Sequence, residues 1–211
     1  MDTIFALASA PGKAGISVIR ISGSAAISVV EKITKSKLNG PTPKLRVIYD
    51  VDDSFIDQAL VLTFQAPNSF TGENVAELHL HGSSAVVSLT VNLLNNIKGL
   101  RLAEAGEFTR RSLDNGKIDL AQVEGLADLI DAETTAQHMQ AARVFTGALG
   151  KKTKEWRQTL IKAAALLVAT IDFSDEEVPE DVTLEVEALI NTVISELDKD
   201  CLLYTSDAAD E

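Results

Sequence analysis

No proline occurs between Pro67 and Pro179, and this gap divides the chain into two parts of different character. Proline ends or kinks helices, so a stretch of this length without one permits long uninterrupted helices. The residues up to Gly116 are instead interrupted by glycine or proline at short intervals, which is typical of short elements joined by turns. We therefore expect a mixed domain followed by a helical one.

The first 118 residues alternate between strand-like and helical patterns. Short runs rich in β-branched and aromatic residues predict strands at Thr3–Ser9, Ile16–Ser22, Lys44–Tyr49, Ala59–Phe64 and Val75–His81. Apolar residues at helical spacing predict helices over Ser24–Thr34, with Ser22 or Ser24 as N-cap, and over Ser84–Ile97. This order favours an α+β domain with a mixed sheet over residues 1–118.

From Leu120 the apolar residues recur every three or four positions, which indicates amphipathic helices. A second pattern over Thr134–Ile171 permits a helix of ~35 residues, weakened in its middle by Gly147 and Gly150. Only Val182–Leu197 offers another amphipathic run to pack against it. Residues 119–200 are therefore expected to form an incomplete all-α domain.

Composition excludes several classes of protein. Hydrophobic residues make up 45% and charged residues 24%, which are ordinary globular values. No apolar run approaches the ~18 residues of a membrane span, and the single cysteine cannot form an internal disulfide. Residues 172–211 hold one lysine against fourteen carboxylates, and no segment is basic enough to bind nucleic acid unaided. We expect a cytoplasmic protein without membrane attachment.

The last eleven residues, Cys201–Glu211, break the preceding helical period. Their sequence, CLLYTSDAADE, resembles the translation of a sequencing adapter. We interpret residues 201–211 as a non-native tail and assign no redox role to Cys201.

Arg20 lies in a predicted strand, on the same face as Ile16 and Val18. One interpretation places it at a sheet edge, where the guanidinium reaches water. The other makes it a fixed cation facing an anionic ligand, because its planar fork matches carboxylates.

The segment Glu77–His81 places Glu77, His79 and His81 on one strand face. A carboxylate and two imidazoles can bind a metal, which gives a metal-dependent hydrolase as one hypothesis. Alternate residues of a strand lie ~6.6 Å apart, however, which is too far for all three to reach one ion without a bend. A ligand-facing polar surface and a solvent-facing one are the other interpretations.

Lys117 follows a predicted short helix over Glu107–Leu113 that ends at Asn115-Gly116. By itself it is typical of a solvated charge at a helix C-terminus. The chain contains no phosphate-binding P-loop, since Phe145–Lys152, the nearest approach, lacks the first glycine and the hydroxyl residue.

Several motifs in collinear order resemble the MnmE/TrmE tRNA-modification GTPases over residues 1 to about 200. They are Asp2–Ile4, Ala10–Ile16, Arg20–Gly23, Pro67–Glu73, Glu77–Gly82, Gly106–Arg111, Asn115–Gln122, Ala127–Ala132 and Ile171–Glu177. The resemblance implies an α+β domain similar to the folate-binding part of the glycine-cleavage aminomethyltransferase. A helical domain follows, interrupted in the family by a G domain that these residues lack.

The resemblance also implies a function. Members bind a tetrahydrofolate derivative, either 5-formyl- or 5,10-methylene-tetrahydrofolate, and form a homodimer through the N-terminal domain. With a flavin-containing partner of the MnmG/GidA type, they modify carbon 5 of the wobble uridine of tRNA. GTP, potassium and magnesium belong to the G domain, so we expect no GTPase activity here, and tRNA binding only in the full complex.

By motif position, the folate contacts of the family fall on Arg20, Glu77 and Lys117. A carboxylate such as Glu77 can accept the adjacent donors of a pterin, and Arg20 or Lys117 can bind the carboxylates of the folate tail. The resemblance assigns His81 and the Asn68–Glu73 loop to the pocket wall. The alternatives are a free-standing folate-dependent aminomethyl transferase, the metal-dependent hydrolase, and a dimerising fragment that binds no ligand.

Overall fold

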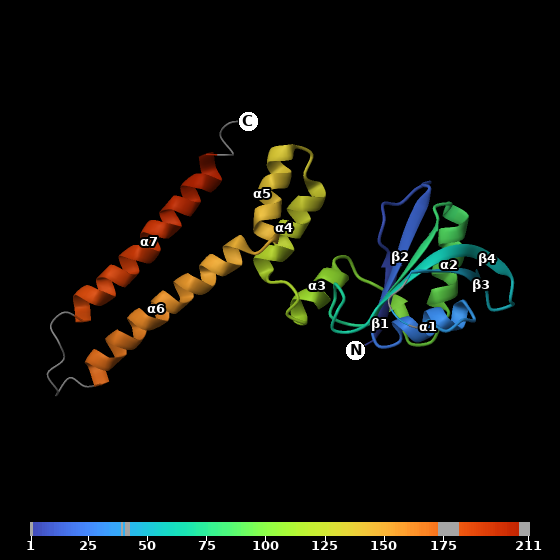
Figure 1. Ribbon diagram of the computed structural model, residues 1–211, viewed down its shortest axis with the longest axis horizontal. Helices are drawn as coiled ribbons and strands as arrows, with labels where there is room; N and C mark the ends of the chain where they lie inside the picture. Colours follow the sequence, from blue (N-terminus) through green and yellow to red (C-terminus); the bar gives the residue numbers. More distant parts are fainter. Residues whose placement is uncertain (1, 39, 41–42, 173–181, 207–211) are drawn as a thin grey trace. The chain divides into compact units, whose positions relative to one another are not determined.

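The computed structural model describes residues 2–38, 40, 43–172 and 182–206 (Figure 1). The chain divides into two compact units whose sequence boundary lies between Val123 and Glu124. Most of the Ile171–Glu177 motif and residues 207–211 of the expected tail lie outside the described residues.

In the described part of the N-terminal unit, six strands form one mixed sheet in the order β3-β4-β5-β2-β1-β6. The strands are β1 (Thr3–Leu7), β2 (Ile16–Ser22), β3 (Lys44–Tyr49), β4 (Phe55–Phe64), β5 (Val75–His81) and β6 (Leu100–Leu102). Strands β1 and β6 pair in parallel, and the other neighbours pair antiparallel. The predicted α+β class with a mixed sheet is confirmed.

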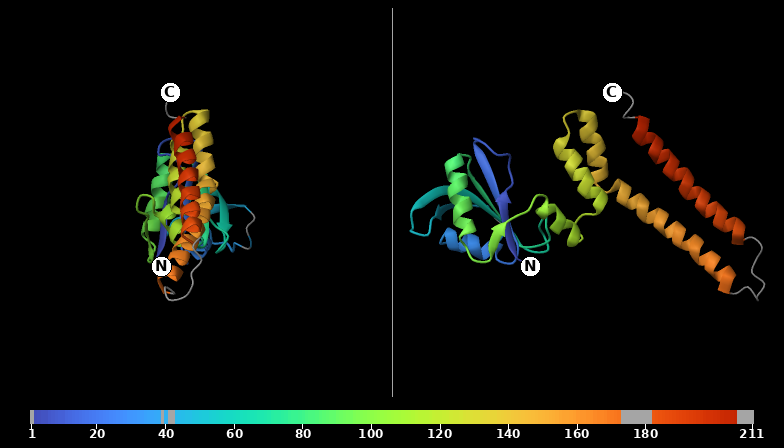
Figure 2. Two further views of the ribbon diagram at one scale, coloured as in Figure 1. Left: turned by 90° about the vertical axis from the view of Figure 1, so that its left-hand side faces the viewer. Right: turned by 180° about the vertical axis from the view of Figure 1, so that it is seen from behind.

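Two helices, α1 (Ala26–Ile33) and α2 (Ser84–Asn95), cover one face of this sheet (Figures 1 and 2). Val30 of α1 and Leu94 of α2 are fully buried in the same core as Ile19, Ile21 and Leu78. Strand alternation sends these core side chains to the helix-covered face, so the residues between them point to the opposite face. We call that opposite face the open face.

Strand register places the open-face residues in rows. One row runs across the sheet from Leu45 through Leu60 and His79 to Val18, and the next contains Glu77 and Arg20. The side chains of the first row are poorly covered, since Leu45 is 55% exposed and Leu60 38% exposed. An apolar sheet surface is therefore accessible beside the Arg20–Glu77 row.

One end of the open face is covered by residues 65–74, which we call the 65–74 loop, and by α3 (Glu107–Asp114). Ser22 and Val75 belong to this end and are buried. The Ser22 hydroxyl donates to a Glu73 carboxylate oxygen over 2.7 Å and lies 2.7 Å from the Thr71 hydroxyl. One end of the open face is thus covered, and the rest of it is exposed.

Three details of the N-terminal unit differ from expectation. Strand β2 lies between β5 and β1, so placing Arg20 at a sheet edge is wrong. Helix α1 is preceded by Ala25 without a side-chain cap, rather than by Ser22 or Ser24. Strand β6 was not predicted, because three residues are too short to show a pattern.

In the described part of the helical unit and its junction, four helices follow: α4 (Leu120–Asp131), α5 (Thr135–Phe145), α6 (Ala148–Asp172) and α7 (Val182–Ser206). The prediction of one continuous helix over Thr134–Ile171 is wrong, because the helix is interrupted between the end of α5 at Phe145 and the start of α6 at Ala148. Gly147 has φ +85°, a left-handed conformation that glycine adopts readily and that ends a helix. Gly150, the other weak point, remains inside α6.

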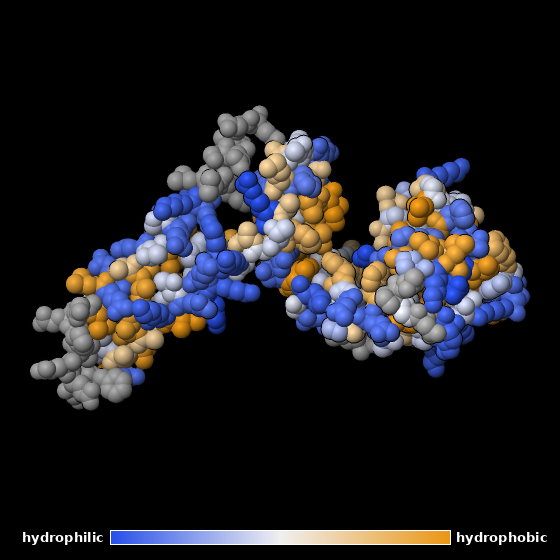
Figure 3. Space-filling view, in the orientation of Figure 1, coloured by the Kyte–Doolittle hydropathy of each residue, from blue (hydrophilic) through white to orange (hydrophobic). Residues whose placement is uncertain are grey.

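Helices α6 and α7 form an antiparallel pair (Figure 1). Trp156 on α6 donates its indole N–H to Glu196 over 2.7 Å, and Val186 and Val193 of α7 are buried. Many apolar side chains of this pair stay exposed and give the orange areas over both helices in Figure 3. Helix α7 continues past the predicted end at Leu197 to Ser206.

No helix among the described residues is long and apolar enough to cross a membrane.

Candidate functional site

Arg20 and Glu77 form an ion pair across the two central strands. Antiparallel pairing of β2 with β5 places the two residues directly opposite each other on the open face. The Nε–H of Arg20 donates to Oε1 of Glu77 over 2.8 Å, and the side chains are 28% and 15% exposed. Two residues separated by 57 positions in sequence are thus brought together on one face of the sheet.

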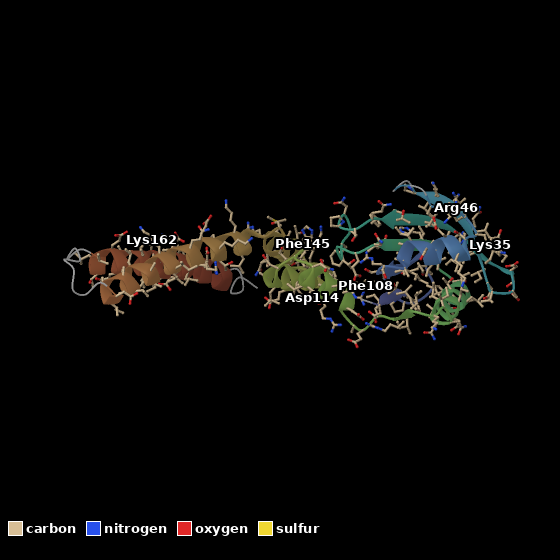
Figure 4. The ribbon with its side chains drawn as sticks, turned by 90° about the horizontal axis from the view of Figure 1, so that it is seen from below. Lys35, Arg46, Phe108, Asp114, Phe145 and Lys162 are labelled. Atoms are coloured by element: carbon tan, nitrogen blue, oxygen red, sulfur yellow. The ribbon has the colours of Figure 1, made fainter. Side chains whose placement is uncertain are left out.

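Two aromatic rings lie against the guanidinium of Arg20. Its Cζ is 5.5 Å from the ring centroid of Phe70 and 5.7 Å from that of Phe108, distances typical of cation–π contacts. Phe70 lies in the 65–74 loop, and Phe108 lies on α3 (Figure 4). Sequence reasoning placed the loop at the pocket but missed Phe108, although it stands inside the Gly106–Arg111 motif.

The pair keeps unused hydrogen-bonding capacity. The second oxygen of Glu77 lies 3.4 Å from Nε2 of His79, which is a weak contact. Each carboxylate oxygen has two lone pairs, so Glu77 can still accept donors from a ligand. Within the described residues, the terminal Nη groups of Arg20 have no acceptor, so a carboxylate or carbonyl can bind there. The arrangement suits a planar ligand that carries both donors and anionic groups.

Lys117 contacts the 65–74 loop, not the Arg20–Glu77 pair. Its ammonium group donates to the carbonyl of Pro67 over 2.8 Å and remains exposed. Two residues near it bind the same loop: Ser112 donates to the carbonyl of Phe70, and Asn115 donates to that of Thr71, both over 2.7 Å. The third predicted residue therefore reaches the site through the loop that carries Phe70.

His81 is held by a buried carboxylate at the start of β4. Its Nδ1 lies 2.7 Å from Oδ1 of Asp57, and its backbone N–H donates to Oδ2 of Asp57 over 2.8 Å. Among the residues with described side chains, no group of three His, Cys, Asp or Glu lies close enough to hold a metal ion. The geometry therefore gives no support to a metal site formed by Glu77, His79 and His81. Sequence reasoning missed Asp57.

A cluster of five charged residues lies behind the covered end of the sheet, and we call it the ionic network. Its members are Asp2, Glu73, Arg101, Glu107 and Arg111. The Arg101 guanidinium donates to Glu107 and, with a backbone N–H from Glu104, lowers the pKa of this buried carboxyl to about 2. Arg101 likewise lowers the pKa of Asp2. Asp2 and Glu107 thus stay ionised at lower pH than ordinary carboxyl groups do.

A separate cavity of about 280 Å³ lies in the helical unit. It is lined by Asp128, Asp131, Ala132, Gln137, Gln140 and Ala141. None of the predicted site residues contributes to it, so it is not the folate pocket expected from the sequence.

Comparison with known proteins agrees with the two-part architecture. Residues 3–117 match a family model described as the N-terminus of the GTP-binding protein TrmE, and residues 120–208 match one described as the MnmE helical domain. These matches cover the sheet unit and the helices that follow it.

Similar curated proteins carry the name tRNA modification GTPase MnmE. One from Roseobacter denitrificans is 60% identical over 93% of this chain and 46% of its own length. One from Dinoroseobacter shibae is 55% identical over the same shares, and one from Phenylobacterium zucineum is 46% identical over 93% of the chain and 44% of its own length. The chain spans about half the length of these relatives. The chain belongs to the MnmE/TrmE family of tRNA modification GTPases.

Proposed function

We propose that the N-terminal unit binds a tetrahydrofolate derivative, either 5-formyl- or 5,10-methylene-tetrahydrofolate. Glu77 accepts the adjacent N–H and amino donors of the pterin, while Arg20 and Lys117 provide cations for its carboxylates. The observation that carries this proposal is the Arg20–Glu77 pair on an accessible sheet face, with Phe70 and Phe108 against the guanidinium of Arg20. When bound, the folate supplies a one-carbon unit.

The residues present fit such a ligand. Phe70 and Phe108 offer apolar ring surfaces beside the charged pair, which is the environment that a flat heterocycle prefers. Glu77 and Arg20 neutralise each other, so neither is left as an isolated charge before the ligand arrives. The exposed ammonium group of Lys117 can turn from the Pro67 carbonyl toward an anionic tail.

We further propose that two copies of the chain dimerise through the N-terminal unit, using the open face. Leu45, Leu60 and Ile16 are exposed there, and Ile16 reaches 62%. Burying such apolar side chains stabilises association by about 25 cal/mol per Å² of apolar area removed from water. A partner on this face also covers the accessible side of the Arg20–Glu77 site.

The wider activity that we propose is supported in its coarse part by the relatives' shared name, tRNA modification GTPase, and in its details by the family resemblance alone. The chain takes part, with a flavin-containing partner of the MnmG/GidA type, in modifying carbon 5 of the wobble uridine of tRNA in the cytoplasm. GTP, potassium and magnesium are bound by a G domain outside these 211 residues, which contain no P-loop pattern. A free-standing aminomethyl transferase is the weaker proposal, because helices rather than further β domains follow Leu120.

Calorimetric titration with 5-formyltetrahydrofolate tests the ligand. We expect saturable binding to the wild-type chain, weakened about tenfold or more by Glu77→Gln, because a charge-assisted acceptor is lost. Asp114→Asn is the matched control: it makes the same carboxylate-to-amide change on the exposed surface of α3 and should leave the Kd unchanged. Absence of wild-type binding, or equal weakening by both variants, overturns the folate proposal.

Sedimentation velocity tests the dimer. Leu60→Asp places a charge in the centre of the open face and should convert the dimer to monomer. Val51→Asp, at an 80% exposed turn position off the sheet, should leave the dimer intact. Leu167→Asp tests whether the exposed apolar side chains of α6, which include Leu160, Leu167 and Ile171, drive association instead. A monomeric wild type, or dissociation by Leu167→Asp alone, contradicts the proposed dimer surface.

A further inference from the structure

Arg111 connects three segments that are distant in sequence. One of its terminal nitrogens donates to the carbonyl of Asp2 over 2.9 Å and to both carboxylate oxygens of Glu73, at 3.1 and 3.2 Å. The other donates to the Asp2 carboxylate over 2.8 Å and to Glu107 over 3.0 Å. The side chain is only 7% exposed. A single guanidinium thus joins the start of β1, the 65–74 loop and α3.

The two rings beside Arg20 belong to two of these segments. Phe108 is one helical turn before Arg111 on α3, and Phe70 lies three residues before Glu73 in the loop. Ser112 and Asn115 already tie α3 to the loop through backbone carbonyls. These two bonds hold the rings relative to each other, but they do not fix the loop and helix to the sheet.

The bonds from Arg111 and Glu73 make much of that second connection, beside the bonds from Arg101 of β6 to Glu107 and the contact between the Ser22 and Thr71 hydroxyls. Asp2 directly precedes β1, and Glu73 accepts the hydroxyl of Ser22, which ends the strand that carries Arg20. The network therefore sets the position of both rings over β2. Arginine suits this role because its planar fork serves several acceptors at once, which a lysine ammonium cannot match in geometry.

We propose that Arg111 is a positioning residue for the Arg20–Glu77 site: by fixing α3 and the 65–74 loop to the sheet, it holds Phe70 and Phe108 against Arg20. This inference rests on the proposed function for its binding consequence, but its structural part is independent of any ligand. Arg111 itself does not touch the Arg20–Glu77 pair through any contact among the described residues.

The ligand-free test is the ¹⁵N NMR signal of the Arg20 Nε–H group. In the wild type this group is hydrogen-bonded to Glu77 and lies beside two aromatic rings, so its signal should be shifted by the ring currents and protected from exchange. We expect Arg111→Met to move this signal toward the free-arginine position while the amide signals of β2 and β5 persist. Arg111→Lys should give an intermediate shift.

Binding provides the second measurement. With 5-formyltetrahydrofolate, Arg111→Met should raise the Kd roughly tenfold, because groups that are no longer preorganised must be ordered on binding. Arg110→Met is the matched control, because Arg110 directly precedes Arg111 on α3 and its side chain is 58% exposed. Should Arg111→Met fail to fold, Glu73→Gln replaces it, because it weakens the bond between network and loop while leaving the Arg111 bonds to Asp2 and Glu107.

The outcomes separate the two ideas. If the wild type binds no folate, the proposed function fails, yet the Arg20 signal still tests the positioning role. An unchanged Arg20 signal in both Arg111→Met and Glu73→Gln overturns the inference. So does a raised Kd with an unchanged Arg20 signal, because Arg111 then acts on the ligand by another route.

Discussion

The N-terminal unit and the helical unit use different kinds of contact. In the first, buried side chains from strands and helices far apart in sequence form one core, and a partly buried ionic network joins α3 to the sheet. In the second, few side chains are buried, and apolar residues such as Leu167 and Ile171 remain exposed. The candidate site therefore depends on contacts between residues distant in sequence, whereas the helices form mainly from the local spacing of apolar residues.

A large effect is expected when the ionic network loses a carboxylate. Glu107 is 2% exposed and binds both Arg101 and Arg111, so Glu107→Gln should destabilise the N-terminal unit by about 3 kcal/mol, as expected for breaking a buried ion pair. The folded pKa of about 2 lies below the usual 4.5, so the carboxylate contributes stability above about pH 4.5 and loses it as pH falls toward 2. Urea unfolding followed by circular dichroism across this range should show a pH slope that Glu107→Gln flattens. An unchanged slope contradicts the role of Glu107.

A core truncation sharpens the contrast between the units. Leu78→Ala removes a fully buried side chain of β5 and should cost roughly 2–5 kcal/mol in the N-terminal unit. Trp156, the only tryptophan, lies in α6 and reports on the helical unit through its fluorescence. We expect Leu78→Ala to shift the circular dichroism transition and leave the tryptophan transition in place. If both transitions shift together, the two units unfold as one.

Within the helical unit, Gly125→Ala should have a moderate effect. A Cβ at Gly125 would lie 2.7 Å from the backbone nitrogen of Phe145 and 3.0 Å from the Val144 side chain, so α4 and α5 would have to separate. Overpacking of this kind costs about 1–3 kcal/mol. Glu124→Ala, at the exposed neighbouring position, is the control and should be nearly neutral. Thermal unfolding by circular dichroism distinguishes the two variants.

The smallest effect is expected at the surface of the α6–α7 pair. Lys162 (Figure 4) donates to Glu185 over 2.7 Å, and both side chains are about half exposed. Exposed ion pairs contribute about 0–1 kcal/mol and are screened by salt. Lys162→Met should therefore lower the tryptophan-monitored urea midpoint only slightly in low salt, and even less in high salt, where the pair is already screened. A large, salt-dependent loss would show that the helical unit relies on this pair.

The sequence predicted the local elements well and the tertiary contacts poorly. Strands β2, β3 and β5 were placed with their observed bounds, because β-branched runs bounded by turns are a local signal. The end of the helix at Gly147 was not predicted. A glycine in a helical pattern lowers helix stability, but the sequence does not show whether that glycine will adopt a left-handed φ. Ala25 precedes α1 without a side-chain cap, and its own backbone N–H donates to the hydroxyl of Thr3, a residue 22 positions away that no local pattern could identify.

The site shows the same limit. Arg20, Glu77 and Lys117 were named from family motifs, and only strand register revealed that the first two are partners. Phe108 and Asp57 were not named, because their roles arise from residues 88 and 24 positions away. No periodicity within a short window can report such distant pairings.

Cross-strand placement of Arg20 opposite Glu77 also determines where the gene can change length. Segments that lie between β2 and β5 but outside the strands can gain or lose residues without separating Arg20 from Glu77. The register of β2 against β5 positions the two residues, and the length of the connecting segments does not. A single codon inserted within β2 itself would turn the arginine toward the helices and expose an isoleucine in its place. Length variation among homologous genes should therefore accumulate at the turns and be absent from these two strands.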